Sequence, residues 1–402
     1  MTEKGLDNFF ETYLKKEPLF LDKSVIQSAH TPDEIPHREE QIKQIANILA
    51  PALRMERPSN IFIYGKTGTG KTVCVRHTTK KLQGVAKQNN IQLDIIYVNC
   101  KLSKIADTEY RLVAHLAREF GKEIPSTGLP TGEVYNIFYK AIDEKKRMIV
   151  IVLDEIDQLI NKTSDEILYN LTRINSELKN AQISIIGISN DLVFADNIDP
   201  RVKSSLSEEE LVFPPYNAIQ IQDILKHRTS KAFKNNVLEQ GLLEKCAAYA
   251  AKDHGDARRA LELIRVAGEL AERNNEEKVS IKHLDMAEDK IEKDRVIDII
   301  TTQPLQFKAT LYAAILLKKE KKNTTFTGDI YEIYKDICSK TGLRPLTQRR
   351  ISDIIAEFDM LGIINAKVIS KGRYGRTREI NLAVPPAIEP KIKEIIVKDL
   401  GL

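Results

Sequence analysis

Residues 60–82, "NIFIYGKTGTGKTVCVRHTTKKL", decide the fold. The apolar "IFIY" predicts a short buried strand, "GKTGTGKT" (65–72) matches G-x-x-x-x-G-K-[ST], and "VCVRHTTKKL" continues as a helix. Strand, glycine-rich loop and helix in this order are the context of a P-loop, whose backbone N–H groups and helix dipole bind phosphate oxygens. The alternative, a glycine-rich turn that matches by chance, is disfavoured by the flanking strand and helix.

The P-loop motif predicts ATP or ADP with Mg²⁺ as the bound ligands. Lys71 would meet the β- and γ-phosphates, and Thr72 would ligate the magnesium. The nucleotide-binding residues predicted within and beside this loop are Gly65, Thr67, Gly68, Thr69, Gly70, Lys71, Thr72 and Val73.

A second element, "RMIVIVLDEIDQL" (147–159), predicts a buried parallel strand that ends in two carboxylates. Asp154 would hold the magnesium through water, and Glu155 would act as the general base on the attacking water. The alternative is a buried strand followed by a solvated acidic turn. A P-loop upstream favours the catalytic interpretation.

Two further apolar stretches, residues 93–100 and 181–191, predict strands, and the second ends in the polar Asn190. Helical patterns occupy the segments between the strands. Alternating strands and helices predict an α/β fold with a parallel sheet covered on both faces.

Composition sets the broad class. The chain has 402 residues and a net charge of +4, which suggests two or three soluble domains. The N-terminus lacks a secretory signal pattern, and the longest apolar run (148–153) is too short to span a bilayer, so we expect a cytoplasmic protein without membrane contact. Four widely spaced cysteines indicate neither a disulfide framework nor a zinc site.

The charge is concentrated near the C-terminus. Residues 301–384 carry 15 Lys+Arg and 8 Asp+Glu, or +7, whereas 385–402 are neutral and 1–300 carry −3. The same module predicts helices at 304–320, 327–342 and 346–362, then two strands, 363–370 and 378–382, joined by the basic "KGRYGRTR" (371–378). Three helices and a basic hairpin indicate a winged helix.

A winged helix binds DNA by placing its third helix in the major groove and its hairpin along a neighbouring groove. The predicted DNA-binding residues are Thr347, Gln348, Arg349, Arg350, Lys371, Arg373, Tyr374, Arg376 and Arg378. A solvated turn, or a winged helix that binds protein, remains the alternative.

The ordered motifs resemble a known family. The P-loop, "DEID" (154–157), a strand ending in Asn190, "DPRV" (199–202) and "GDAR" (255–258) are similar to the AAA+ ATPases. The resemblance narrows to archaeal origin-recognition and cell-division-control type initiators of DNA replication, and it covers nearly the whole chain. The stretches that carry this closer resemblance are "IPHREEQI" (35–42), "DPRVKSSL" (199–206), "FPPYNAIQIQDILKHR" (213–228), "GDARRAL" (255–261) and the basic C-terminal module.

The resemblance implies an α/β AAA+ ATPase with a helical lid and a C-terminal winged-helix domain. The implied segments are an N-terminal arm (1–20), a nucleotide-binding base (21–215), a lid (216–299), the winged helix (300–384) and an amphipathic tail (385–402), which would dock on the body or on a partner.

The resemblance also implies roles for individual residues. Asn190 would be sensor 1 and Arg258 sensor 2, reaching the γ-phosphate from the lid. The implied residues around the adenine are Ile35, Pro36, His37, Arg38, Tyr216 and Arg228.

Two further positions carry weaker implications. Arg201 would face a neighbouring subunit, but Ser205 stands where some relatives have a second arginine, so weak ATP hydrolysis is expected. The segment 101–140, with Arg118 and Lys122, is either an insert that contacts DNA or an ordinary surface helix.

The implied function is that of an ATP-dependent replication initiator that binds duplex origin DNA and helps recruit or load a minichromosome-maintenance type helicase. ATP would act as a slow conformational switch, paralogous initiators on adjacent sites are candidate partners, and the protein would associate with the nucleoid. The alternatives are a signalling or remodelling P-loop ATPase whose winged helix binds protein, and a subunit similar to clamp loaders.

Overall fold

The computed structural model describes residues 17–27, 30–101, 106–125, 127–163, 165–192, 194, 198–206, 208–320, 325–370, 376–385 and 388–402. The chain divides into two compact units, Met1–Leu284 and Asp285–Leu402. The division falls within one helix, α13 (Ile281–Thr302).

Unit 1 is built on a five-stranded parallel sheet with the order β2–β3–β4–β1–β5. The strands are β1 (Ile61–Tyr64), β2 (Leu93–Asn99), β3 (Arg147–Asp154), β4 (Ala181–Ser189) and β5 (Glu209–Val212). Every residue of β3 is buried, because helices cover both faces of the sheet, and this explains its continuous apolar run. The predicted α/β parallel sheet is confirmed, and β5 is an additional edge strand.

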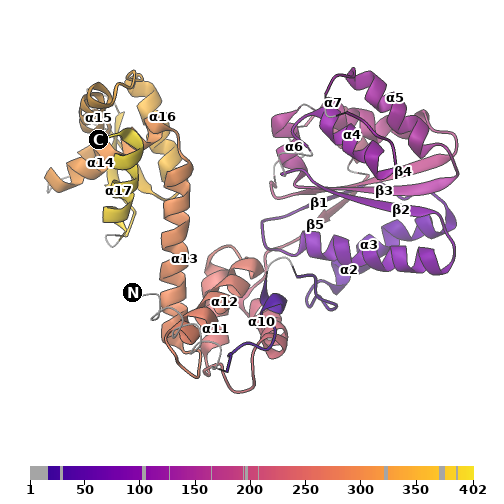
Figure 1. Ribbon diagram of the computed structural model, residues 1–402, viewed down its shortest axis with the longest axis horizontal. Helices are drawn as coiled ribbons and strands as arrows, with labels where there is room; N and C mark the ends of the chain where they lie inside the picture. The colour runs from indigo at the N-terminus through magenta and orange to yellow at the C-terminus, as the bar shows by residue number, and fades with distance from the viewer. Residues whose placement is uncertain are drawn as a thin grey trace, which may run out of the picture. The chain divides into compact units, whose positions relative to one another are not determined.

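Helices form a layer on each face of this sheet (Figure 1). One layer contains α2 (Glu39–Leu49) and α3 (Lys71–Gln88), whose apolar sides pack in a core with β1. The other layer contains α4 (Glu109–Glu119), α5 (Thr131–Ile142), α6 (Ile156–Lys162), α7 (Glu166–Arg173) and α9 (Pro200–Leu206). Two short 3-10 turns, η2 (Ala50–Arg54) and η3 (Ile174–Ser176), also belong to this part of unit 1, whereas a third, η1 (Lys23–Ile26), packs on helices of the lid.

The lid of unit 1 is helical. It contains α10 (Ala218–Ala232), α11 (Leu242–Lys252), α12 (Ala257–Arg273) and the start of α13. Asn217 caps α10, since its side chain accepts a hydrogen bond from the Gln220 N–H and the Gln220 side chain accepts one from the Asn217 N–H. Phe20, which precedes η1, packs on Phe233 at the end of α10 with ring centroids 4.4 Å apart. Phe20 is therefore part of the lid core.

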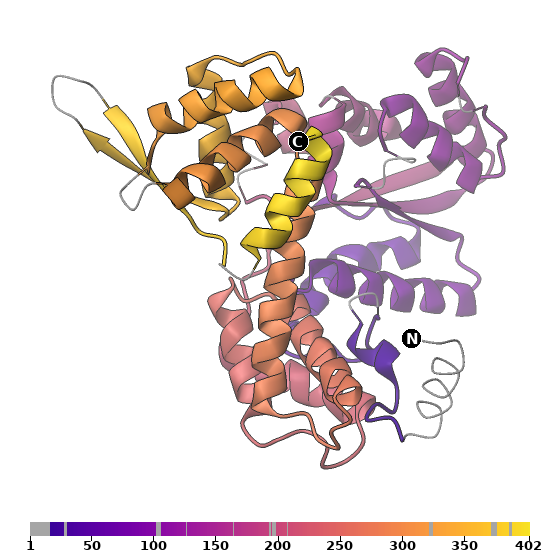
Figure 2. The same ribbon diagram turned by 60° about the vertical axis from the view of Figure 1, so that its left-hand side comes forward.

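Unit 2 has the predicted winged-helix order. Its elements after α13 are α14 (Leu305–Glu320), β6 (Thr325–Phe326), α15 (Thr327–Thr341), α16 (Gln348–Met360), β7 (Ile364–Ser370), β8 (Arg376–Leu382) and α17 (Glu389–Leu400). The strands form an antiparallel sheet with the order β6–β8–β7, and the β7–β8 hairpin projects from the helices of this unit (Figure 2).

The C-terminal helix α17 packs on α14 within unit 2. Ile392 and Ile396 are buried in the same core as the winged-helix residues. Lys308 Nζ on α14 lies 2.7 Å from the Asp399 carboxylate. The tail therefore docks on its own unit.

None of the helices in the described part of the chain combines the length and the hydropathy needed to cross a membrane.

Candidate functional site

The P-loop connects β1 to α3 at the carboxyl edge of the sheet. Lys71 is 4% exposed, and its Nζ donates hydrogen bonds to the carbonyl oxygens of Gly65 at 2.6 Å and Lys66 at 2.7 Å. Burial, assisted by the nearby Arg258 charge and opposed by the Asp154 charge, lowers the pKa of Lys71 to about 8. Phosphate oxygens would supply the negative charge that this buried ammonium lacks.

Thr72 and Asp154, the two predicted magnesium ligands, are in contact. The Thr72 hydroxyl donates to the Asp154 carboxylate at 3.0 Å (Oδ2) and 3.2 Å (Oδ1). The Tyr97 hydroxyl also donates to Asp154 Oδ2, and burial followed by the Asp154 charge raises the pKa of Tyr97. The Arg76 guanidinium lies 4.1 Å from the centroid of the Tyr97 ring. Sequence reasoning missed Tyr97, which holds this carboxylate from the neighbouring strand β2.

A hydroxyl and a carboxylate are the oxygen ligands that Mg²⁺ prefers, with phosphate and water supplying the others. In the part of the chain that the structure describes, no group of three or more His, Cys, Asp and Glu side chains could hold a metal ion by itself. The donors present at Thr72 and Asp154 therefore fit a magnesium ion that arrives with the nucleotide.

Glu155 and Asn190 follow β3 and β4 at the same edge of the sheet. Glu155 has φ +57°, a left-handed conformation that is rare for a non-glycine residue and is common at functional sites. The Asn190 N–H donates to Asp157 Oδ1 at 3.4 Å, and the Ser189 hydroxyl donates to the same oxygen at 3.1 Å. The buried Asp157 thus anchors the end of β4, a role that sequence reasoning did not assign.

The lid contacts the P-loop through the first turn of α12. The Ala257 N–H donates to the Gly68 carbonyl at 3.3 Å, and the Asp256 side chain caps the helix by accepting from the Arg258 N–H at 2.8 Å. A Cβ atom on Gly68 would lie only 1.7 Å from Asp256 Oδ1. This close approach places Arg258 beside the phosphate-binding loop.

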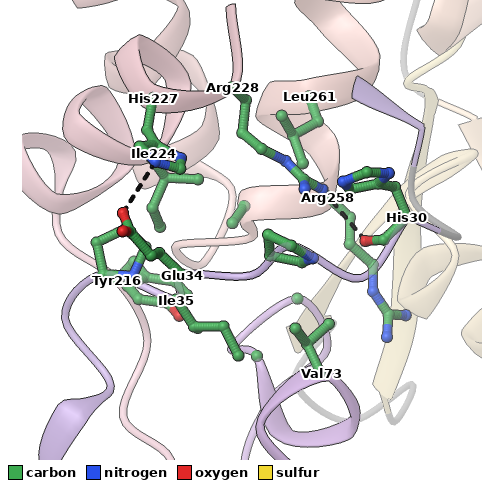
Figure 3. A pocket seen from close by; sticks show the side chains of 15 residues that line it. His30, Glu34, Ile35, Val73, Tyr216, Ile224, His227, Arg228, Arg258 and Leu261 are labelled. Carbon is green, nitrogen blue, oxygen red and sulfur yellow. Dashed lines mark hydrogen bonds and ion pairs between the residues drawn. The ribbon is translucent and has the colours of Figure 1, made fainter. Parts of the chain in front are cut away.

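A pocket lies between the P-loop side of the base and the lid helices (Figure 3). Of the residues predicted to bind nucleotide, those that line it are Ile35, Pro36, Gly68, Gly70, Val73, Tyr216, Arg228 and Arg258. Figure 3 shows Arg228 and Leu261 across the pocket from Val73. The mostly apolar wall suits a planar base, and it also includes His30, Glu34 and His227, which were not predicted.

Arg228 lines this pocket with a side-chain N–H donor, Nη1, that has no acceptor among the described residues. The residue is buried, which lowers its pKa, and its Nη2 donates to the His30 carbonyl at 3.3 Å. No described residue accepts a hydrogen bond from its buried Nη1. Since buried donors are nearly always paired, this atom fits a ligand with acceptor atoms, such as a nucleotide.

His37 and Arg38 do not line the pocket. His37 Nε2 lies 3.2 Å from Asp223 of α10. Arg38 is 2% exposed, and its guanidinium donates to the carbonyls of Thr69 (2.9 Å), His37 (3.2 Å) and Pro214 (2.5 Å). Its guanidinium carbon lies 3.9 Å from the centroid of the Tyr216 ring. Arg38 therefore ties the P-loop to the segment that enters the lid.

Arg201 lies at the surface, with its side chain 68% exposed, at the start of α9. Its guanidinium donates to both carboxylate oxygens of Asp199, at 3.1 Å and 2.8 Å. These bonds, with one from the Arg201 backbone N–H, lower the pKa of Asp199 to about 2. Arg118 and Lys122 also have local contacts, to the Ile124 carbonyl at 2.7 Å and to Glu144 at 2.6 Å.

The predicted nucleic-acid contacts of unit 2 separate into three sets. Thr347, Gln348, Arg349 and Arg350 are exposed at the start of α16, where Thr347 is the N-cap. Arg378 on β8 instead donates to the Ser352 carbonyl of α16 at 2.5 Å and so fixes the hairpin to that helix. Lys371, Arg373, Tyr374 and the side chain of Arg376 lie outside the described residues.

Comparisons with known proteins match the whole chain. Family models match an AAA domain at residues 54–193, a Cdc6 AAA+ ATPase-type lid domain at 222–289 and a CDC6 C-terminal winged helix domain at 298–389. The ORC1-type DNA replication protein of Thermococcus onnurineus is 53% identical over 403 residues, covering 99% of this chain and 96% of that protein. Its counterpart from Pyrococcus furiosus is 54% identical over 401 residues, with coverage of 99% and 94%.

Solved structures of related proteins have the same fold. The Aeropyrum pernix ORC1 protein in complex with DNA is 43% identical, with a TM-score of 0.85, over 96% of this chain and 98% of that chain. The Aeropyrum pernix ORC2 protein, solved as ADPNP–ADP complexes, shares the fold at 20% identity and a TM-score of 0.60, over 95% of this chain and 98% of that chain.

Proposed function

The chain belongs to the family of ORC1-type DNA replication proteins, and from this premise we propose that it is an ATP-dependent initiator that binds duplex DNA at replication origins. The predicted resemblance to archaeal initiators of the AAA+ class is confirmed. One observation carries the proposal: a P-loop in contact with its lid helix and a winged helix with an exposed basic helix start occur in the same chain.

DNA binding would use the start of α16. The exposed side chains there, with Arg349 and Arg350 at their centre, would meet phosphates and base edges in the major groove. Arg350 lies 3.5 Å from Glu357 with its side chain half exposed, so this ion pair is weak and can be exchanged for phosphate. The ORC1 relative solved in complex with DNA supports DNA binding by this chain. The basic hairpin tip, including Arg373 and Arg376, would add contacts in a neighbouring groove.

The nucleotide would act as a conformational switch. Lys71 would bind the phosphates, and Thr72 and Asp154 would hold a magnesium ion that neutralises their charge. Glu155 would accept the proton of the attacking water, Asn190 would orient that water, and Arg258 would report the γ-phosphate to the lid. Arg201 is held by Asp199 on an exposed surface, so it would act on a neighbouring subunit only after exchanging this partner. Slow hydrolysis would follow.

The downstream partner would be a minichromosome-maintenance type helicase, recruited or loaded once the initiator is on DNA. Paralogous initiators would occupy adjacent sites, and the protein would act on the nucleoid in the cytoplasm. Pull-down of the helicase by origin-bound protein, with ATP compared against ADP, tests this step; equal recovery without origin DNA would contradict it.

The direct test is duplex binding as a function of salt, with ATP present. We expect wild type to prefer an origin repeat over random duplex. Each phosphate contact removed should flatten the log–log salt slope by about 0.9, so Arg349→Ala/Arg350→Ala should weaken binding and flatten the slope by about 2. Arg54→Ala/Arg273→Ala, which removes two exposed arginines of unit 1, is the matched control. No origin preference, or no difference between the two variants, would favour a winged helix that binds protein.

A further inference from the structure

A second pocket lies at the amino-terminal edge of the same sheet, opposite the P-loop. It is lined by residues at the start of β3 and β4, by η3 and its continuation, and by the segment that precedes β1. The strand β3 runs from Arg147 at this edge to Asp154 at the nucleotide edge, a length of about 23 Å at 3.3 Å per residue. We call it the strand-start pocket. It is distinct from the nucleotide pocket.

The lining of the strand-start pocket is cationic. Ten residues line it, of which four are basic (Arg57, Lys146, Arg147 and Lys179), three are Asn or Gln, and none is acidic. Lys146 and Lys179 are exposed and form no salt bridge with any residue of the described ranges.

The nearby carboxylates are already engaged by other donors. Glu208 lies 3.0 Å from Arg57. Asp143 accepts the backbone N–H groups of Lys179 (3.1 Å), Asn180 (2.6 Å) and Ala181 (2.9 Å). The charge of Lys179 also acts on Asp143, but its ammonium makes no hydrogen bond to that carboxylate. The two lysine ammonium groups therefore remain available to an external anion.

Arg147 provides the second, independent observation. Its side chain is 9% exposed, lies over the Phe120 ring at 5.1 Å and makes one long ion pair, 3.4 Å from Nη1 to Asp94. Its buried Nε has no hydrogen-bond partner among the described residues. A buried donor without an acceptor is costly and uncommon. Arg147 therefore brings to the pocket lining a buried positive charge that its single long ion pair offsets only in part.

We infer that the strand-start pocket binds a phosphate group. Two lysine point charges, a planar guanidinium and the side-chain amide of Gln182 match an anion with three or more acceptor oxygens better than a single carboxylate. The side-chain amides of Asn175 and Asn180 already donate to backbone carbonyls, at 2.9 Å each. The phosphate would come from a free phosphate ion or from the backbone of DNA. Binding of a free phosphate ion is inferred from the pocket alone, whereas binding of a DNA backbone phosphate also rests on the proposed function.

The test uses the full chain saturated with ADP, so that the P-loop is filled. Inorganic phosphate is titrated calorimetrically into wild type and into Lys146→Ala/Lys179→Ala, and duplex DNA binding against salt is measured on the same proteins. Lys43→Ala/Lys81→Ala, which removes two exposed lysines of α2 and α3, is the matched control for net charge. Both variants should keep wild-type ADP affinity, since none of these lysines is at the P-loop.

Phosphate binding to wild type that weakens about tenfold or more in the pocket variant alone identifies a free phosphate ion as the ligand. Absence of phosphate binding, with a DNA salt slope shallower by about 1 or more in the pocket variant alone, identifies a backbone phosphate. The inference is overturned if the pocket variant matches the control in both measurements. If wild type does not bind DNA at all, the proposed function is contradicted, but the phosphate titration still shows whether the strand-start pocket binds phosphate.

Discussion

Replacing Arg38 by alanine is expected to lower the free energy of unfolding by about 3–5 kcal/mol and to weaken ADP binding together with it. The side chain is 2% exposed and donates to three backbone carbonyls, of Thr69, His37 and Pro214. A hydrogen bond to a charged group contributes about 1.5–3 kcal/mol, and the guanidinium also loses its contact with Tyr216. The alanine variant also avoids the cost of burying a charged guanidinium, which offsets part of this sum and brings the net loss of unfolding free energy to about 3–5 kcal/mol.

The weaker binding of ADP is expected because of the two segments whose carbonyls lose their hydrogen bonds to Arg38. Thr69 belongs to the P-loop, and Pro214 precedes the lid, so one side chain holds both segments. Arg38→Lys should fall between wild type and alanine, because one ammonium replaces the charge but not the planar fork. Urea unfolding followed by circular dichroism gives the stability, and titration with ADP gives the affinity.

The control is Arg54→Ala, an exposed arginine at the end of η2, for which a change within about 0.5 kcal/mol is expected. The reasoning is refuted if Arg38→Ala unfolds at the same urea concentration as this control, or if it is destabilised while ADP affinity stays at the wild-type value.

Three other outcomes are expected. Burial lowers the pKa of Lys71 to about 8, below its value of 10.5 in the unfolded chain, so between these pH values the unfolded state binds more protons than the folded state. The free energy of unfolding of the apoprotein should therefore rise with pH in this window, by up to about 1.4 kcal/mol per pH unit more in wild type than in Lys71→Met. Parallel pH profiles of the two proteins would contradict this. Asp157→Ala removes the acceptor of the Ser189 hydroxyl and the Asn190 N–H, so ATP turnover should fall while ADP affinity is kept, and unchanged turnover would exclude this positioning role. Ile396→Ala leaves a cavity under α17 and should cost unit 2 about 2–5 kcal/mol in urea unfolding, whereas exposed Met360→Ala should cost less than about 0.5 kcal/mol.

The elements with strong local patterns could be predicted from sequence. The P-loop and the buried strand β3 each combine an apolar run with a motif, and helix α16 combines an apolar period with an N-cap, so local chemistry and tertiary structure agree. Strand β5 was missed because it is a four-residue edge strand with one buried side chain and two glutamates.

The unpredicted parts depend on contacts between distant segments. Arg38 was expected beside the adenine because of its position before the P-loop, but its partners are backbone carbonyls, which a sequence does not display. Tyr97 on β2 donates to Asp154 at the end of the neighbouring strand, which only the sheet register reveals. Asp157 on α6 accepts from residues at the end of β4, which only the packing of that helix on the sheet reveals. Arg378 was grouped with the wing arginines by composition, and its hydrogen bond to the Ser352 carbonyl of α16 is a contact between distant segments that the sequence does not display.

Gly68 gives the P-loop a requirement that its consensus does not contain. The pattern G-x-x-x-x-G-K-[ST] leaves this position open, yet here φ is +71° and the Asp256 carboxylate of α12 fills the space of a Cβ atom. The constraint has two parts: the positive φ strains any residue other than glycine, and a side chain at this position would collide with Asp256 of the lid. A lid helix docked in this way therefore adds a steric requirement for glycine to the conformational requirement that the loop already has. Gly68→Ala should therefore weaken the contact between α12 and the P-loop, which makes it a variant for measuring what lid docking contributes to nucleotide binding.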